Sequence, residues 1–232
     1  MDLSEQLIRP VARIRTEFPQ KFGIPRQSGL VEDLRGELVF LPEYRDPEAF
    51  RGLEEFSHLW LIWQFSRARR EGWSPTVRPP RLGGNVRKGV FATRSPFRPN
   101  SLGLSSVRLL EVRLHTPEGP VLVVGGADLL DGTPVYDVKP YLPYTDSHPE
   151  AAGGFALQQK EGPLRVDFPP DLLERFPPDR RKAVLDLLAQ DPRPGYQDAP
   201  DRVYGLAFAG WEVRFRVEGD TLTVVRAEPC LE

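Results

Sequence analysis

The chain has 232 residues, of which 31 are Lys or Arg and 33 are Asp or Glu, so its formal net charge is −2. This balance excludes a strongly basic protein that binds nucleic acid through its overall field, and any RNA contact must come from a local basic patch. Hydrophobic residues make up 40% and charged residues 28% of the chain, which excludes an intrinsically disordered protein. The length suits one large domain, or one domain with a small appendage.

Cysteine usage and apolar runs narrow the class further. A single Cys excludes a disulfide within the chain, and we expect no metal site. The N-terminal stretch MDLSEQLIRPVARIRTEF lacks the apolar run of a signal peptide. The longest apolar stretches, residues 59–63 and 121–124, are too short to cross a bilayer. We therefore expect a cytoplasmic protein without a membrane segment.

The abundance of Pro and Gly, with 25 and 20 residues, favours short strands joined by turns over long helices. In chain order, the segments predicted to be strands are residues 7–14, 37–41, 57–65, 104–114 and 121–129. The last of these contains Gly125 and Gly126, a pair typical of a bulge or of a close backbone approach. Together the segments predict a mainly β protein, in which an antiparallel sheet forms a barrel or a sandwich.

Two helices are predicted. The first covers residues 47–52, where Asp46 is a suitable N-cap, Pro47 suits the first helical position and Gly52 suits the end. The second covers residues 178–190 and is followed by an Asp-Pro pair that ends it. Its apolar residues share one face: Ala183, Val184, Leu187 and Leu188.

A domain boundary is predicted between residues 148 and 162, where small residues without periodicity interrupt the pattern. We expect residues 1–150 to form the β-barrel domain and residues 151–232 to form a small α+β C-terminal module. The module would contain a strand at residues 164–168, the second helix, and a hairpin of residues 211–217 and 221–226 with Glu218-Gly219-Asp220 as its turn.

Three segments carry more polar and turn residues than a fold requires: residues 18–30, 91–104 and 128–146. The second displays donors on a loop shaped by Pro and Gly, which suits a carboxylate, a phosphate or an adenine edge. These donors are Arg94, Ser95, Arg98, Asn100 and Ser101. A solvated surface loop is the alternative interpretation of the same residues.

The third segment places Asp137 and Lys139 two residues apart, so on a strand both face the same way and either pair or flank one site. Its tyrosines offer flat surfaces for stacking a base or a purine: Tyr136, Tyr141 and Tyr144. A structural ion pair with core aromatics is the alternative. The histidines His58, His115 and His148 match no zinc spacing. The chain also has no GxGxxG, P-loop or GxSxG motif, which leaves a Rossmann site or a Ser hydrolase unsupported.

At these segments the sequence resembles the TsaA-like tRNA methyltransferases, the TrmO family. The resemblance is carried by FPQKFGIPRQSGL, EFSHLWLIWQF, RSPFRPN, DLLDGTPVYDVKPYLPYTD and DPRPGYQDAPDRVYGLAF, in this order along the chain. It implies a small antiparallel β-barrel and a homodimer with the cofactor near the subunit interface. It also implies S-adenosylmethionine as cofactor, and as substrate a tRNA carrying threonylcarbamoyladenosine just 3′ of the anticodon, methylated at N6.

The resemblance also implies a set of cofactor contacts on the matched motifs. The expected contacts are Pro25, Arg26, Gln27, His58, Leu59, Arg94, Leu104, Leu130, Asp131, Gly132 and Thr133. In this set the Gln27 amide suits the adenine edge, Asp131 suits a ribose hydroxyl, and Arg94 or Arg26 suits the methionine carboxylate.

The acceptor nitrogen belongs to a ureido group and is a poor nucleophile, so a carboxylate that removes its proton would help the reaction. We expect Asp137 to be this base, with Lys139 and Tyr141 positioning the substrate. The expected tRNA contacts are Arg98, the arginines of residues 67–70, Arg193 and Arg202.

Three alternatives remain open from the sequence. A non-enzymatic RNA-binding barrel would stack bases on its aromatic residues and bind no S-adenosylmethionine. An S-adenosylmethionine-dependent enzyme with another acceptor would also fit, and the net charge of −2 favours a small acceptor. A small-molecule hydrolase has no recognisable pair of nucleophile and base behind it.

Overall fold

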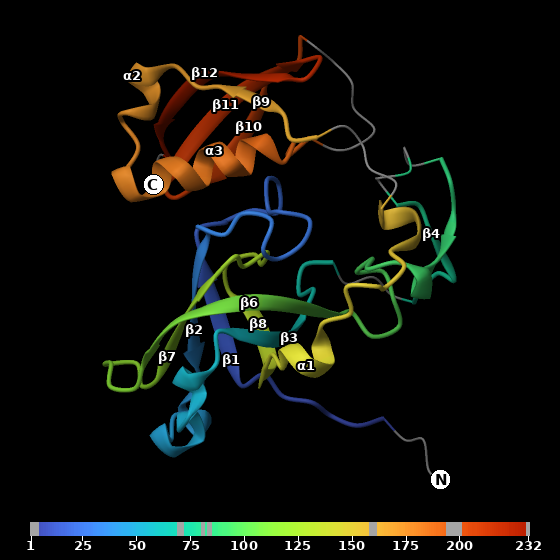
Figure 1. The fold of residues 1–232 in the computed structure, drawn as a ribbon, viewed down its shortest axis with the longest axis vertical. Coiled ribbons are helices and arrows are strands. Elements are labelled where there is room, and N and C mark those ends of the chain that lie inside the picture. The colour runs from blue at the N-terminus through green and yellow to red at the C-terminus, as the bar shows by residue number, and fades with distance from the viewer. Residues whose placement is uncertain are drawn as a thin grey trace.

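Six strands close into an antiparallel barrel in the order β1-β2-β7-β6-β3-β8 (Figure 1). The structure, a computed structural model, describes residues 5–68, 72–79, 82, 85–157, 162–193 and 201–230. The barrel strands are β1 (Ala12–Thr16), β2 (Arg35–Phe40), β3 (His58–Gln64), β6 (Leu102–Arg113), β7 (Val121–Gly125) and β8 (Thr133–Pro140). This arrangement confirms the predicted mainly β fold and its antiparallel barrel. Closure also removes the exposed sheet edges that invite aggregation.

Alternation along each strand explains why the sheet closes around a core. In β3, Leu59, Leu61 and Trp63 are buried, whereas the residues between them are partly exposed. The inward residues of neighbouring strands meet these side chains in one cluster that includes Ile14 and Val124. Apolar side chains removed from water in this way are the main source of stability for a small barrel.

Strand β8, and strand β10 (Tyr204–Phe208) of the C-terminal module, lie where the sequence pattern alone predicted no strand. β8 has the sequence TPVYDVKP, with a Pro at each end that lacks an N–H donor. It still pairs with both β1 and β3, and a register shift opposite Ile62 and Trp63 accommodates the extra residue. The polar side chains on its outer face and its two prolines therefore give no strand pattern in the sequence, although this strand completes the barrel.

The predicted first helix is a short 3-10 turn, η2 (Pro47–Phe50). Its start is as predicted, because the Asp46 side chain accepts a hydrogen bond from the Glu48 N–H at 3.0 Å and Pro47 follows. Its end is earlier than predicted, because Gly52 adopts a left-handed conformation with φ of 82° and begins the next turn, η3 (Leu53–Glu55). The remaining short elements outside the C-terminal module are η1 (Pro42–Tyr44), β4 (Thr76–Val77), β5 (Lys88–Gly89), η5 (Val90–Ala92), α1 (Pro143–Asp146) and η6 (Gly154–Leu157).

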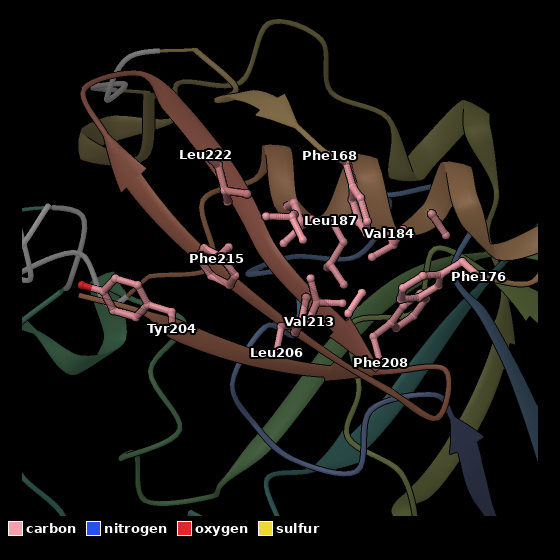
Figure 2. Packing of buried hydrophobic residues seen from close by; sticks show 14 of the residues in the cluster. Phe168, Phe176, Val184, Leu187, Tyr204, Leu206, Phe208, Val213, Phe215 and Leu222 are labelled. Carbon is pink, nitrogen blue, oxygen red and sulfur yellow. The ribbon is translucent and has the colours of Figure 1, made fainter. Parts of the chain in front are cut away.

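The C-terminal module is a four-stranded sheet in the order β10-β11-β12-β9, covered on one face by helix α3 (Figure 1). Its elements are β9 (Arg165–Asp167), α2 (Pro170–Leu173), η7 (Pro178–Arg180), α3 (Arg181–Ala189), β10 (Tyr204–Phe208), β11 (Trp211–Glu218) and β12 (Thr221–Pro229). The predicted hairpin is confirmed, as is the predicted helix with its apolar face buried. Figure 2 shows Val184 and Leu187 of α3 pointing toward Val213, Phe215 and Leu222 on the sheet.

The loop between β1 and β2 joins the two parts of the molecule. Phe18, Val31 and Leu34 come from the N-terminal part of the chain, yet they are buried in the core of the C-terminal module. Arg180 of the module donates to Glu17 at 2.5 Å, and their side chains are only 20% and 24% exposed. Figure 1 shows this loop rising from the barrel to the C-terminal sheet. Residues 18–34 are thus held from both sides.

The predicted close backbone approach at Gly125-Gly126 is confirmed. β7 ends at Gly125, and Gly126 has φ of +73°. The Gly126 carbonyl accepts a hydrogen bond from the Gly29 N–H at 2.9 Å, and the Gly126 N–H donates to Leu34 O at 2.7 Å. This glycine therefore ties the β1–β2 loop to the end of β7. Among the described residues, none of the helices combines the length and apolar character needed to cross a membrane.

Replacement of Gly126 by Ala should destabilise the protein more than a similar replacement in an open turn. A Cβ at Gly126 would lie 3.2 Å from the Gly29 backbone, and φ is also positive. We expect a loss of about 2–4 kcal/mol in the free energy of unfolding, measured by chemical denaturation. Gly219→Ala is the matched control, because Gly219 has φ of +57° but open space around it. That control should lose only about 1–2 kcal/mol, and equal losses in the two variants would contradict the close approach.

Candidate functional site

A pocket of about 660 Å³ opens at one end of the barrel, where the three polar segments meet. It lies beside the end of β3 and the starts of β6 and β8. Its lining is formed by Lys21, Ile24, Pro25, Arg26, Gln27, Trp63, Gln64, Phe65, Ser66, Arg67, Ala68, Arg94, Pro96, Arg98, Asn100, Leu102, Gly103, Leu104, Asp128, Leu130 and Thr133. The volume and the mixture of apolar walls with a few polar groups are typical of a site for a nucleoside-sized molecule.

Two loops that are far apart in sequence form adjoining walls of the pocket. A guanidinium N–H of Arg94 donates to Oε1 of Gln27, which joins the loop after η5 to the loop between β1 and β2. The Arg94 loop is shaped by side-chain hydroxyls, because Thr93 accepts from the Ser95 N–H at 3.3 Å and Ser95 accepts from the Phe97 N–H at 3.2 Å. Donors on this loop are therefore held in place before a ligand arrives.

A chain of hydrogen bonds lies behind the inner wall. The indole N–H of Trp63 donates to Ser105 Oγ at 3.0 Å, and the Ser105 hydroxyl donates to Asp128 Oδ1 at 2.6 Å. Trp63 can adopt this position because its neighbour on β6 is Gly103, where a Cβ would lie 2.3 Å from the indole ring. Burial raises the pKa of Asp128, although hydrogen bonds from Ser105 and the Ser28 backbone and the nearby charge of Arg94 oppose the rise.

The pocket is strongly basic although the chain as a whole is not. Five basic residues line it: Lys21, Arg26, Arg67, Arg94 and Arg98. Among the described lining residues, Asp128 is the only carboxylate. The local basic patch that the net charge of −2 required is therefore found at this end of the barrel.

The structure brings seven of the eleven predicted cofactor contacts to this pocket. They are Pro25, Arg26, Gln27, Arg94, Leu104, Leu130 and Thr133. The other four do not line it. His58 lies at the far end of β3, with Nδ1 2.9 Å from Ser57 Oγ, and Leu59 is buried inside the barrel. Gly132 and Asp131 form the turn before β8, where Asp131 Oδ1 accepts a hydrogen bond from the Thr16 N–H at 2.9 Å.

The residues predicted to act on the substrate lie on or just after β8, outside the pocket lining. Asp137 and Lys139 face the same way, as predicted, and form an ion pair at 3.2 Å with side chains 48% and 63% exposed. The Tyr141 ring lies 5.5 Å from the ring of Trp60 on β3. This face continues to the pocket through Tyr136, whose hydroxyl donates to Gln64 Oε1 at 2.6 Å. The roles of Asp137, Lys139 and Tyr141 in the reaction stay predictions.

The predicted tRNA contacts are distributed over several places. Arg67 and Arg98 line the pocket, and residues 69 and 70 lie outside the described residues. In the C-terminal module, Arg193 forms a bidentate pair with Asp191 at 2.8 and 3.0 Å. Its carbonyl accepts a hydrogen bond from Arg26 at 3.4 Å, which places it near the pocket loop. Arg202 lies over the ring of Tyr204, 5.2 Å from its centroid.

Several residues of the pocket were not identified from the sequence. The sequence pattern places Trp63 only within an aromatic strand, and it does not distinguish Lys21 and Asp128 from the other residues of their motifs. The sequence holds a usable signal for Asp128, which is an acidic residue shortly after an apolar strand and a glycine pair. It holds one also for its partner Ser105, which is a polar residue at an inward position of β6. Buried polar groups of this kind need partners and often mark a site.

Comparison with known proteins agrees with the sequence motifs. The model of the tRNA-methyltransferase O N-terminal domain matches residues 13–147, and the model of the TrmO C-terminal domain matches residues 161–230. The tRNA (adenine(37)-N6)-methyltransferase of Escherichia coli K12 is 43% identical over 224 residues, which cover 93% of this chain and 95% of that protein. The enzyme of the same name from Eikenella corrodens is 53% identical over 164 residues, covering 70% and 92%.

Solved structures give the same result. The crystal structure of TrmO from Pseudomonas aeruginosa superimposes with a TM-score of 0.77 at 32% identity, covering 98% of this chain and all of that one. Because both domain models match in the same order as in TrmO, and relatives align over nearly the full length, this chain belongs to the TrmO family of tRNA methyltransferases.

Proposed function

We propose that this protein transfers a methyl group from S-adenosylmethionine to N6 of adenosine 37 in tRNA. The observation that carries the proposal is that three family motifs converge on one basic pocket of nucleoside size. Its relatives from Escherichia coli and Eikenella corrodens carry the name of this activity. The substrate we propose is adenosine 37 bearing a threonylcarbamoyl group, and the reaction takes place in the cytoplasm.

The pocket residues fit S-adenosylmethionine chemically. Arg94 and Arg26 provide guanidinium groups for the methionine carboxylate, and the Gln27 amide provides a donor and an acceptor for the adenine edge. Ile24, Leu130 and Leu104 provide apolar surface for the adenine and ribose. Bound there, S-adenosylmethionine supplies a methyl group on a good leaving group, and the protein supplies position and exclusion of water.

The basic rim is the part of the pocket that suits tRNA. Arg67, Arg98 and Lys21 line the pocket together with the proposed cofactor residues, so phosphates bound by them would hold the anticodon loop at the mouth. The face that bears Asp137, Lys139 and Tyr141 continues from this mouth along β8, and we propose that it positions the nucleotides next to the modified base.

We further propose that the protein is a homodimer with the pocket close to the subunit interface. Leu104 lines the pocket, yet it is 55% exposed, which suits a wall completed by a second subunit. Sedimentation velocity should show a species of twice the chain mass of 26.3 kDa. Leu104→Glu should shift it to the monomer and weaken cofactor binding together. A monomer in the unmodified protein would exclude a dimeric site.

Calorimetric titration with S-adenosylmethionine tests the cofactor site directly. We expect saturable binding that Arg94→Ala weakens about 10–100-fold, because a charge-assisted hydrogen bond to the carboxylate is lost. Arg51→Ala is the matched control, since Arg51 is exposed, pairs with Glu48 and lies away from the pocket. Equal S-adenosylmethionine affinity of the wild type, Arg94→Ala and Arg51→Ala would show that Arg94 does not contact the cofactor. Absence of binding to folded wild-type protein that still binds tRNA would favour an RNA-binding barrel.

Salt dependence tests the proposed tRNA contacts. Each phosphate contact releases counterions, so tRNA affinity should fall steeply as salt rises, and Arg98→Ala should reduce the slope of log K against log salt by about one. Arg67→Ala should do the same. Arg226, which is paired with Glu228 on β12, offers a control substitution to Ala that leaves the slope unchanged. A flat salt dependence in the wild type would contradict phosphate binding by the basic rim.

A further inference from the structure

We propose that Asp128, on the inner wall of the pocket, is the carboxylate that removes the proton from the acceptor nitrogen. The inference deepens the proposed function and rests on it. It differs from the expectation drawn from the sequence, in which Asp137 had this role.

The described pocket lining contains one group that can act as a base. A general base must be unprotonated near neutral pH and within reach of the reacting nitrogen. The charged residues of the described lining are four arginines, one lysine and Asp128. The arginines and the lysine are protonated and donate only. The described lining contains no His, Cys or Tyr, so Asp128 is the one group there that can accept a proton.

Hydrogen bonds hold the Asp128 carboxylate in a fixed orientation. Asp128 Oδ1 accepts the Ser105 hydroxyl at 2.6 Å, and Ser105 accepts the Trp63 indole N–H at 3.0 Å. The Ser28 backbone N–H also bonds to the carboxylate. The carboxylate is thus oriented by groups on β6, β3 and the β1–β2 loop, while Asp128 remains part of the pocket lining. A base held in this way loses little entropy when the substrate arrives.

With S-adenosylmethionine bound, the Asp128 carboxylate would take the N6–H proton while the nitrogen lone pair forms the new N–CH3 bond. The methyl–sulfur bond would break with its electron pair on sulfur, so the products would be neutral S-adenosylhomocysteine, the methylated nitrogen and a protonated Asp128. Desolvation makes this carboxylate a stronger base than one in water, since burial raises its pKa.

Asp137 has a different environment. Its carboxylate is about half exposed, is paired with Lys139 at 3.2 Å and lies outside the pocket lining. Its place on the outer face of β8 fits substrate positioning better than proton removal.

Single-turnover methylation of tRNA that carries threonylcarbamoyladenosine, at saturating S-adenosylmethionine and tRNA, tests the proposal. Asp128→Asn keeps the size of the side chain and its acceptor for Ser105. We expect the rate to fall about 100–10,000-fold, the usual contribution of a general base, with S-adenosylmethionine affinity by calorimetry within about threefold of wild type. Asp186→Asn is the control, because the Asp186 carboxylate pairs with Lys182 at 3.0 Å on helix α3 and lies outside the pocket lining. That control should keep the wild-type rate.

A pH profile separates a base from a structural group. The wild-type rate should fall about tenfold per pH unit below the pKa of Asp128, and Asp128→Asn should lose this dependence. Ser105→Ala should move the acid limb to higher pH, because the hydrogen bond it removes lowers the pKa of Asp128. The other charged groups of the described pocket lining are Arg94, Arg26, Arg98, Arg67 and Lys21, and Arg94 is the one whose charge acts on Asp128.

Three results would overturn the proposal. The first is an undiminished rate in Asp128→Asn. The second is a loss that resides in S-adenosylmethionine binding and disappears at saturation, which would make Asp128 an anchor for the cationic cofactor. The third is loss of the acid limb in Asp137→Asn and not in Asp128→Asn. If the wild-type protein itself transfers no methyl group, the proposed function fails, and this outcome is distinct from an active wild type with an active Asp128→Asn.

Discussion

The site depends on the way that the β1–β2 loop is held between the barrel and the C-terminal sheet. Phe18, Val31 and Leu34 are buried in the core of the module, and the Gly29–Gly126 hydrogen bond ties the same loop to the end of β7. Gln27, between these anchors, can therefore meet Arg94 from a loop far along the chain. Ordering such a loop costs conformational entropy at every residue, and here the burial of large apolar side chains offsets that cost.

This arrangement gives the C-terminal module a role in shaping the pocket even though it contributes no described residue to the pocket lining. The ion pair between Arg180 and Glu17, both largely buried, fixes the entrance of the loop to the module. Replacing one residue of an ion pair that is withdrawn from water leaves the other charge buried without an opposite charge beside it. The barrel supplies the walls of the site, and the module keeps one of those walls in place.

The sequence predicted the elements whose signals are local. Apolar segments identified five of the six barrel strands, and the spacing of Ala183, Val184, Leu187 and Leu188 identified the face of α3. β8 was missed because its outer face is polar and its ends are prolines. The pocket was predicted only in part, because the side chains of one sequence motif point in different directions and only some of them reach the pocket. Leu59 belongs to a matched motif, but its side chain is buried in the barrel core. The Asp131 carboxylate accepts a hydrogen bond from the backbone N–H of Thr16 and does not line the pocket.

Asp128 shows why a reactive carboxylate needs both burial and cations around it. In an apolar pocket, desolvation would raise its pKa until the group was protonated at neutral pH and unable to accept a proton. Beside an exposed arginine alone, the pKa would fall and the carboxylate would be a weak base. Here burial raises the pKa, while Ser105, the Ser28 N–H and Arg94 limit the rise. The pocket lining therefore places Asp128 among cationic groups while burial raises its pKa, a combination that suits a carboxylate that accepts a proton.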